Sequence, residues 1–396
     1  MHDQAMSFVE RVLERFPHLM NGPVVEMGSR ILNTSVRALF PDVETYIGVD
    51  ASDGPGVDVV SLAHDYQPTR PIPLVLSCET LEHDPYWRHS LANMVAMLTD
   101  NGSLIITCAS PERPAHEVAC APDGQHYQGL HMLDVLQQLR ELAEWFFLWG
   151  EDQPTPGDTY VAAIGRQVRR TRPRTSIILP CVNRAEETIE AVDSMIRRAK
   201  GTTEIIVIDN GSNEEEARKY QNALPQVYLR YPKMLGYPKA VNWGIRSAAG
   251  EYVLLSNNDV IFDTDGWDSL LIETLPTPMD MVSPVLSYVG NPQQLDSMQR
   301  GSDLVEVEVL FFVSVLCNRK LFRSVGLLDE AFGLGNSEDT DFSIRVRQKG
   351  GHLYVLPTVH VTHEGHPTFL ATIGREALND LTHRNRMRLS SKWFED

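Results

Sequence analysis

The sequence predicts an α/β protein with two domains, each built around a parallel β-sheet. Two stretches of the chain alternate apolar, strand-like runs with helix-like runs, which is the pattern of a parallel sheet covered by helices. A polar, arginine-rich segment at 165–175 interrupts this alternation, which then begins again. The length of 396 residues suits two cores of this kind. We therefore predict one domain over residues 1–170 and a second over residues 171–396.

The expected elements of both domains follow a Rossmann-like order. The first domain opens with an amphipathic helix over 1–16 and a buried strand that ends in a glycine turn, GPVVEMGSR. Its further strands are expected at 45–50, 57–61, 72–77 and 103–108, and its further helices at 33–40 and 87–98. The second domain begins with the buried strand TSIILPCVN. Strands at 204–209 and 227–230 and helices at 185–198 and 213–223 follow it.

Composition and charge limit the classes of protein that this chain can represent. Hydrophobic residues make up 42% and charged residues 22%, as in ordinary globular proteins. The longest apolar run, 309–317, is too short to span a bilayer and predicts a buried strand. The N-terminus has no basic region followed by an apolar block, so we expect no secretory signal and a cytoplasmic location. The net charge of −18 disfavours a nucleic-acid binder, although a local basic groove remains compatible with it.

The five cysteines are odd in number and widely spaced, and none forms a C-x-x-C pair. Neither a disulfide framework nor a structural zinc site is therefore expected. Most of them lie in apolar runs, where cysteine serves as a small core residue.

Polar residues follow the first two strands of the second domain. The first strand ends near Pro180 and Asn183, and the second ends at Asp209 and Gly211. Ligands of open α/β sheets bind at the carboxyl ends of strands, where an Asp can accept hydrogen bonds from a base or ribose. Glycine there lets the backbone approach a ligand closely. An ordinary turn with a helix N-cap explains this short motif equally well.

The segment LGYPKAVNWGIRSAAGEYVLLSNNDVIF is more specific. A loop that begins at Gly236 leads into a helix with Lys239, and an apolar strand then delivers Asn257, Asn258 and Asp259. A carboxylate at a strand end, among other oxygen ligands, suits Mg²⁺ or Mn²⁺ that bridges two phosphates. A simple turn is the alternative, but the wholly apolar strand before it and the apolar VIF after it weaken that interpretation.

Acidic residues and histidines cluster further along the chain. Glu338, Asp339 and Asp341 begin a predicted helix, where carboxylates also serve simply as partners of the helix dipole. After a later strand, histidines recur at a spacing of three residues: His360, His363 and His366. Two or three of them could share a site, or one alone could be a ligand.

Taken in order, these blocks resemble glycosyltransferase family 2, which has the GT-A fold, over roughly 175–368. The resemblance implies inverting transfer of a sugar from a UDP-, GDP- or dTDP-linked donor to a hydroxyl of a glycan or glycolipid acceptor. It assigns to the donor the residues Pro180, Asn183, Asp209, Gly236, Lys239 and Asn258. It assigns Asp259, the last position of the family's D-x-D motif, and His363 to a Mn or Mg ion. Of the matching E-D pair, Asp339 is favoured as the catalytic base, and Glu338 could orient the acceptor.

The first domain carries VVEMGSR, YIGVD and LVLSCETLEHD, which resemble class I S-adenosylmethionine-dependent methyltransferases over about 20–165. The resemblance implies S-adenosylmethionine as cofactor and an O-methylation activity. It assigns binding of the cofactor to Glu26, Gly28, Asp50, Asp65 and Glu79. His83 could act as the base in methyl transfer, although a lone histidine after a strand is equally often structural. The usual G-x-G-x-G is reduced here to Gly28 followed by Ser29 and Arg30. A generic Rossmann-like turn is the alternative interpretation of this loop.

Three hypotheses follow. The chain is a bifunctional enzyme that builds a methylated glycan, or a glycosyltransferase whose first domain is a non-catalytic docking or dimerising module. The third is a glycosyltransferase that acts on modified bases in DNA, against which the acidic balance of the chain argues. Binding of S-adenosylmethionine separates the first two.

Overall fold

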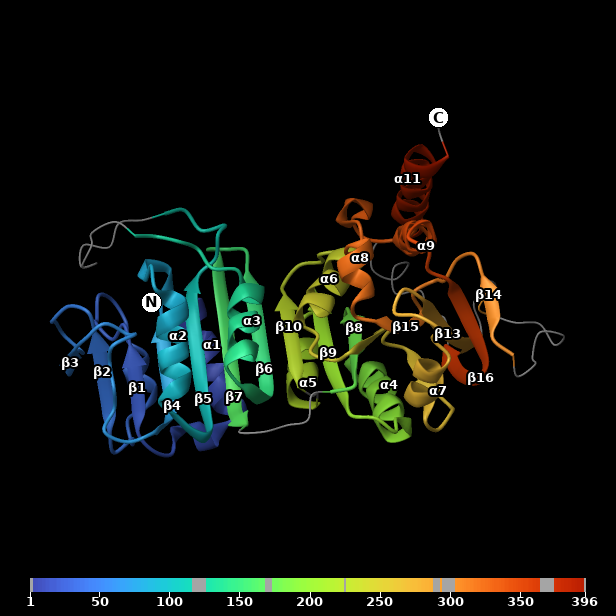
Figure 1. Ribbon diagram of the computed structural model, residues 1–396. Coiled ribbons are helices and arrows are strands. Elements are labelled where there is room, and N and C mark those ends of the chain that lie inside the picture. Colours follow the sequence, from blue (N-terminus) through green and yellow to red (C-terminus); the bar gives the residue numbers. More distant parts are fainter. Residues whose placement is uncertain are drawn as a thin grey trace. The chain divides into compact units, whose positions relative to one another are not determined.

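The computed structural model describes residues 3–115, 126–167, 173–223, 226–287, 293, 303–363 and 374–394 (Figure 1). It is an α/β protein, as predicted, and divides into two compact units. The first unit comprises Met1–Arg170 and Gln226–Arg230, and the second comprises Thr171–Pro225 and Tyr231–Asp396. The predicted boundary at residue 170 lies within 168–172, outside the described residues. No helix in the described part of the chain is long and apolar enough to cross a membrane.

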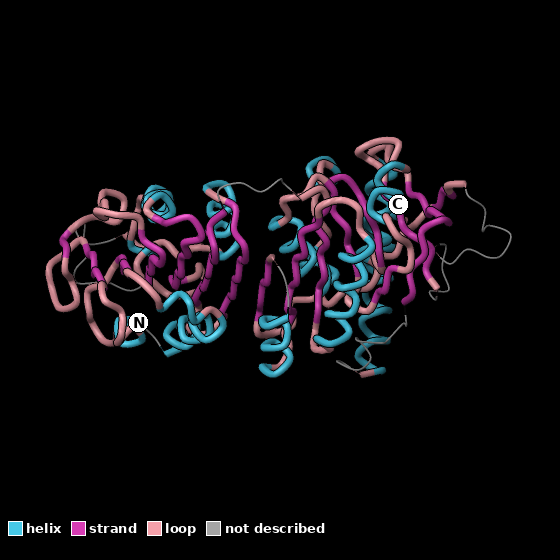
Figure 2. Tube along the Cα trace, turned by 90° about the horizontal axis from the view of Figure 1, so that it is seen from below, coloured by secondary structure: helices cyan, strands magenta, loops and turns pink. Residues whose placement is uncertain are grey.

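The first unit has a mixed sheet with helices on both faces (Figure 2). Its strands are β1 (Val24–Met27), β2 (Tyr46–Asp50), β3 (Val59–Val60), β4 (Ile72–Cys78), β5 (Leu98–Ala109), β6 (Glu144–Gln153), β7 (Asp158–Gln167) and β10 (Val227–Tyr231). They are ordered β10-β6-β7-β5-β4-β1-β2-β3, and β7 alone runs antiparallel to its neighbours β5 and β6. The α-helices are α1 (Asp3–Arg15), α2 (Trp87–Ala96) and α3 (Met132–Leu142).

Two features of this unit differ from the sequence prediction. The expected helix at 33–40 is only a 3₁₀ turn, Val36–Leu39, capped by Ser35, whose Oγ accepts the N–H of Arg37. The preceding Asn-Thr-Ser run favours turns over helix, because such side chains compete for backbone hydrogen bonds. The expected strand at 227–230 does form, as β10, but it pairs in parallel with β6 of the first unit. Tyr228 thereby packs in the core of that unit against Trp149, with ring centroids 6.1 Å apart.

The second unit also has a mixed sheet. Its strands are β8 (Thr175–Cys181), β9 (Thr203–Asn210), β11 (Tyr252–Ser256), β12 (Val260–Phe262), β13 (Met281–Leu286), β14 (Val305–Val307), β15 (Ser314–Asn318) and β16 (Leu353–His363). They are ordered β9-β8-β11-β15-β13-β16-β12, and β14 pairs with β16. The α-helices described are α4 (Ala185–Arg198), α5 (Glu214–Ala223), α6 (Tyr237–Ser247), α7 (Trp267–Glu273), α8 (Leu321–Val325), α9 (Glu338–Gln348) and α11 (Arg375–Trp393).

The topology of the second unit gathers its polar strand ends. Strands β9, β8 and β11 are parallel neighbours, so their carboxyl ends meet at one edge of the sheet. Helix α6 covers β8 and β9 at close range, because a Cβ on Gly244 would lie 2.3 Å from the side chain of Ile178. Strand β15 runs antiparallel to β11 and brings the segment that precedes it to the same edge. We call this carboxyl edge of the second sheet the donor edge.

Candidate active site

The loops after β8 and β9 are joined by hydrogen bonds at the donor edge. The backbone N–H of Asn183 donates to Ser212 Oγ (2.7 Å), and the side-chain oxygen of Asn183 accepts the N–H of Asn213 (3.0 Å). Asp209 is fully buried, and its Oδ1 accepts the N–H of Ser212 (2.8 Å). Pro180 lies in β8 opposite Ile208. Pro180, Asn183 and Asp209, all predicted for the donor, therefore lie at or just after the carboxyl ends of two adjoining strands.

Helix α6 begins against the loop that precedes α9. A Cβ on Gly236 would lie 2.1 Å from the carbonyl oxygen of Gly333, so only glycine allows this approach. The N–H of Tyr237 donates to the carbonyl of Leu334 (3.0 Å). Lys239, in the first turn of α6, is half-buried and forms no ion pair with any described residue. Its ammonium group is available to an anionic ligand.

The turn after β11 is held on two sides. The N–H of Asn257 donates to the carbonyl of Val313 (2.8 Å). The side-chain amide of Asn258 is buried and donates to Thr188 Oγ1 on α4 (2.9 Å). This contact makes Asn258 a positioning residue for the turn, whereas the sequence analysis assigned it to the donor. The next residue, Asp259, is thereby fixed in place.

Asp259 and His363 meet at this turn. Strand β12 pairs antiparallel with β16 and places Val260 opposite His363. Asp259 Oδ1 lies 3.3 Å from His363 Nε2, and the two side chains are only 10% and 12% exposed. Two ligands that bind one cation at about 2.1 Å with a right angle between them are about 3 Å apart, so this pair fits a shared Mn²⁺ or Mg²⁺. Within the described residues no cluster of three or more potential metal ligands occurs.

We predict that His363→Ala lowers affinity for Mn²⁺ much more than His360→Ala does. His360 and His363 are three residues apart on β16, so their side chains point to opposite faces of the strand. The side chain of His360 is exposed. Calorimetric titration of Mn²⁺ into the parent and both variants, with the nucleoside diphosphate present, measures the difference. Equal effects would contradict the assignment of His363. His366 lies outside the described residues.

Glu338 and Asp339 stand at the start of α9, after two residues in the left-handed region. Asn336 and Ser337 have φ values of +79° and +81°, a conformation that costs energy for residues other than glycine. Burial raises the pKa of both carboxyl groups above their ordinary range, and the negative charge of Asp339 raises the pKa of Glu338 further. Oε2 of Glu338 is buried and has no hydrogen-bond partner among the described residues. The site therefore contains two carboxyl groups that take up protons more readily than surface carboxylates.

The segment before β15 links this acidic pair to the metal-ligand turn. The backbone of Phe312 lies near the carboxylate of Asp339 and favours its ionised form, while the carbonyl of the next residue, Val313, accepts the N–H of Asn257. Tyr237 Oη donates to the carbonyl of Phe312 (3.0 Å). The pKa of Tyr237 is raised mainly by burial and further by the negative charges of Glu338 and Asp339. The predicted base and the predicted metal ligand thus lie on either side of one short backbone segment.

Helix α11 fixes the loop that carries the acidic pair, and the sequence analysis missed this role. The buried side chain of Asn385 donates to the carbonyls of Phe332 (2.8 Å) and Gly335 (2.7 Å). Asp341 is fully buried and accepts from Lys392 and Trp393 of α11, at 2.8 Å each, and from Arg345 at 2.9 Å. Asp341 is therefore a structural anchor and not an open carboxylate. No sequence signal marks this role, because the burial of Asn385 depends on how α11 packs against a loop about 50 residues earlier in the chain.

In the first unit, the residues predicted to hold S-adenosylmethionine are engaged by the chain itself. The Oε2 of Glu26 accepts from Tyr46 Oη at 2.7 Å, and Asp50 accepts the backbone N–H groups of Arg30 (3.2 Å) and Ser52 (2.9 Å). The space beside Gly28 is filled, because a Cβ there would lie 1.8 Å from the Oγ1 of Thr80. The side chain of Asp65 is 68% exposed beside His64. These contacts give Glu26, Gly28 and Asp50 roles within the fold of the first unit.

A second group of charges lies after β4 in the same unit. The guanidinium of Arg113 bridges Glu79 Oε2 (2.7 Å) and Asp158 Oδ1 (3.0 Å). Glu79 itself has a φ of +54°. The ring of His83 lies 5.4 Å from that of Tyr127. Glu79 therefore serves an internal ion pair, and His83 is packed against an aromatic ring.

Comparison with known proteins concerns mainly the second unit. Residues 176–332 match the family described as Glycosyl transferase family 2. The chain is similar to an uncharacterized glycosyltransferase of Haemophilus influenzae, with 23% identity over 184 residues that cover 44% of this chain and 62% of that protein. It is also similar to an uncharacterized glycosyltransferase of Rickettsia typhi, with 32% identity over 189 residues that cover 43% of this chain and 58% of that protein. The chain thus spans less than two thirds of either relative.

Among solved structures, the chain is similar to a mannosyltransferase of Pyrobaculum calidifontis in complex with GDP-Man and Mn²⁺. The identity is 17% and the TM-score 0.42, over 55% of this chain and 65% of that one.

Proposed function

We propose that the second unit is an inverting glycosyltransferase of the GT-A type, which uses a nucleotide-sugar donor and a divalent cation. The observation that carries the proposal is that adjacent residues of one segment, Phe312 and Val313, interact with Asp339 and with the turn that carries Asp259. The match of residues 176–332 to Glycosyl transferase family 2 supports the same reaction class.

The donor would lie along the donor edge. Asp209 and Asn183 are placed to contact the nucleoside, since both end parallel neighbouring strands. Asp259 and His363 would hold the cation, which when bound neutralises the developing charge of the diphosphate leaving group. Lys239 adds a positive charge from the first turn of α6, where it has no competing ion pair among the described residues.

Asp339 would act as the base. Its carboxylate takes the proton of the acceptor hydroxyl as that oxygen forms a bond to the anomeric carbon. The bond from that carbon to the diphosphate oxygen breaks on the opposite face, so the configuration inverts. The left-handed backbone at Asn336 and Ser337 and the contacts of α11 hold this carboxylate in place. Glu338 lies beside it and could orient a hydroxyl of the acceptor.

The acceptor is proposed to be a hydroxyl of a glycan or glycolipid. A screen of UDP-, GDP- and dTDP-sugars for donor hydrolysis and for a shift in thermal unfolding, each with Mn²⁺, tests the proposal. We expect one donor to be hydrolysed and to raise Tm only when the cation is present. If no donor does either, the proposed function fails.

The pH dependence of transfer should have an acid limb well above the ordinary Asp pKa of about 3.9. Burial raises the pKa of Asp339 in the folded protein, and only the deprotonated form accepts a proton. The rate, as kcat/KM, should therefore fall as pH drops through this raised pKa, and rise to a plateau above it. A profile measured with a saturating cation checks the prediction. An acid limb near 4 would remove Asp339 from this role.

For the first unit we propose a docking or dimerising role, and we derive no methyl-transfer step. Thr80 fills the space beside Gly28, and Glu26 and Asp50 are bonded within the chain. Calorimetry on the full chain, which retains β10, is expected to give no saturable heat with S-adenosylmethionine or its demethylated product. A saturable heat that Asp50→Ala removes would instead restore the bifunctional hypothesis.

A further inference from the structure

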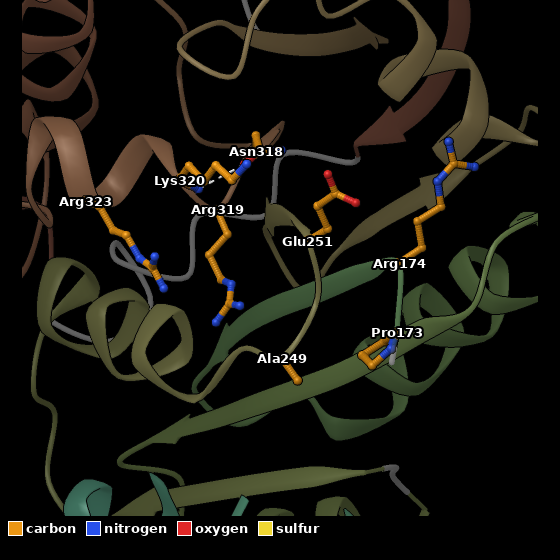
Figure 3. Close-up of a pocket in the computed structure, with 8 residues that line it drawn as sticks. All are labelled: Pro173, Arg174, Ala249, Glu251, Asn318, Arg319, Lys320 and Arg323. Carbon is orange, nitrogen blue, oxygen red and sulfur yellow. Dashed lines mark hydrogen bonds between the residues drawn. The ribbon is translucent and has the colours of Figure 1, made fainter. Parts of the chain in front are cut away.

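A second cavity lies in the second unit, at the end of the sheet opposite the donor edge. It has a volume of about 460 Å³, in the size range of small-molecule pockets. Its lining residues are Pro173, Arg174, Ala249, Glu251, Asn318, Arg319, Lys320 and Arg323 (Figure 3). Arg174 immediately precedes β8, whose seven residues end at the donor edge, so the two sites are about 20 Å apart along the strand.

The lining is strongly basic in a protein whose net charge is −18. It holds four cations and one carboxylate, that of Glu251, which is exposed. Arg174, Lys320 and Arg323 form no ion pair with any residue that the structure describes. Four cations against the one carboxylate of Glu251 leave an excess of three positive charges in this lining. A surface of this kind favours a multiply charged anion.

The cavity is shaped by backbone contacts and not by chance surface side chains. Arg319 Nη1 donates to the carbonyl of Ala248 (2.8 Å), and its backbone N–H donates to the carbonyl of Glu251 (2.9 Å). Nη1 of Arg174 is held by Ser269 Oγ at 3.2 Å. In Figure 3 the guanidinium groups of Arg319 and Arg323 extend toward the same space. Guanidinium groups so placed bind phosphate oxygens through paired hydrogen bonds.

We propose that this cavity, the basic pocket, binds an anion that carries a diphosphate group. The excess of three positive charges matches a diphosphate better than a single carboxylate. The volume also admits more than one phosphate. This chemistry occurs in free diphosphates and in lipid diphosphates, and the experiment separates these two sources. The site is distinct from the donor edge and requires neither Asp259 nor the cation.

The first arm titrates the full chain with inorganic pyrophosphate in EDTA, which removes the cation that binding at the donor edge would need. We expect saturable binding that weakens as NaCl is raised, because salt screens such charges. The double variant Lys320→Gln/Arg323→Gln should bind at least tenfold more weakly. Arg218→Gln on α5, which removes another exposed arginine, should bind like the parent. Asp259→Ala should also bind like the parent.

The second arm measures co-sedimentation of the same proteins, again in EDTA, with phosphatidylcholine vesicles that contain a polyprenyl diphosphate lipid. Vesicle binding that the double variant loses identifies a lipid headgroup as the source, and pyrophosphate binding without vesicle binding identifies a free diphosphate. Lys320 and Arg323 are exposed, so the variant is expected to unfold at the parent temperature. Failure of the parent to bind in both arms, or equal binding by a folded double variant, would overturn the proposal.

Discussion

Replacing Asp259 with alanine is expected to abolish sugar transfer and to remove the dependence of nucleotide binding on Mn²⁺. The carboxylate is one of the two protein ligands proposed for the cation, and the other, His363, lies 3.3 Å away on β16. Charge stabilisation by a metal contributes several kcal/mol to a transition state, so the rate should fall about 10³-fold or more. Assays of transfer, and calorimetry of nucleoside diphosphate with and without Mn²⁺, measure both effects.

A matched control is available four residues away. Asp263 is exposed, and its Oδ2 accepts from Thr362 Oγ1 at 2.8 Å on the same pair of strands. Asp263→Ala therefore removes a carboxylate and a contact between β12 and β16 without touching the proposed ligands. It should leave the cation dependence intact. Transfer by Asp259→Ala at the parent rate would show that the metal site is elsewhere.

Asp339→Asn should retain donor binding and lose most of the transfer activity. The amide keeps the size of the side chain but accepts no proton, and general-base catalysis is worth about 10² to 10⁴-fold. Because the base acts on the acceptor, kcat should fall much more than donor affinity. Single-turnover rates together with calorimetric titration of the donor nucleotide separate the two quantities. A loss below tenfold would favour Glu338 as the base.

Asp341→Asn is the comparison that separates chemistry from folding. Asp341 is buried beneath Arg345, Lys392 and Trp393, and loss of one partner from a buried ion pair costs about 3 to 5 kcal/mol. This variant should lower Tm strongly. Asp339→Asn, by contrast, replaces a carboxylate whose charged form burial already disfavours, and should leave Tm unchanged or higher. A large drop in Tm for Asp339→Asn would mean that its rate loss reflects unfolding.

The sequence predicted well what depends on short stretches of chain. The strands that end at Asp209 and before Asn257 are apolar runs followed by polar turns, and both form where expected. Helix α9 begins at Glu338, as the cluster of acidic residues indicated. Such signals are local, because burial and helix capping act over a few residues.

The features that the sequence did not predict depend on contacts between segments that are distant along the chain. The hydrogen bond from Asn385 to the carbonyl of Phe332 joins residues 53 apart in the sequence, and the ion pair of Arg113 with Asp158 joins residues 45 apart. Neither pair has a motif of its own, because each depends on where two elements meet after folding. The chemical types of the residues were visible in the sequence, but their partners were not. The same limit applies to the hydrogen bond of Asn258 to Thr188 of α4, which no local pattern indicates.

Strand β10 has a consequence for how this protein can be taken apart. The first unit is completed by Gln226–Arg230, which the sequence supplies from the middle of the second unit. The polypeptide therefore crosses between the units three times, after residues 170, 225 and 230. No single cut yields the two units intact, because a truncation at residue 170 removes from the first unit the strand that pairs with β6. Neither unit can therefore be exchanged as one continuous stretch of sequence. A chimaera that replaces the first unit must also replace β10, which completes its sheet.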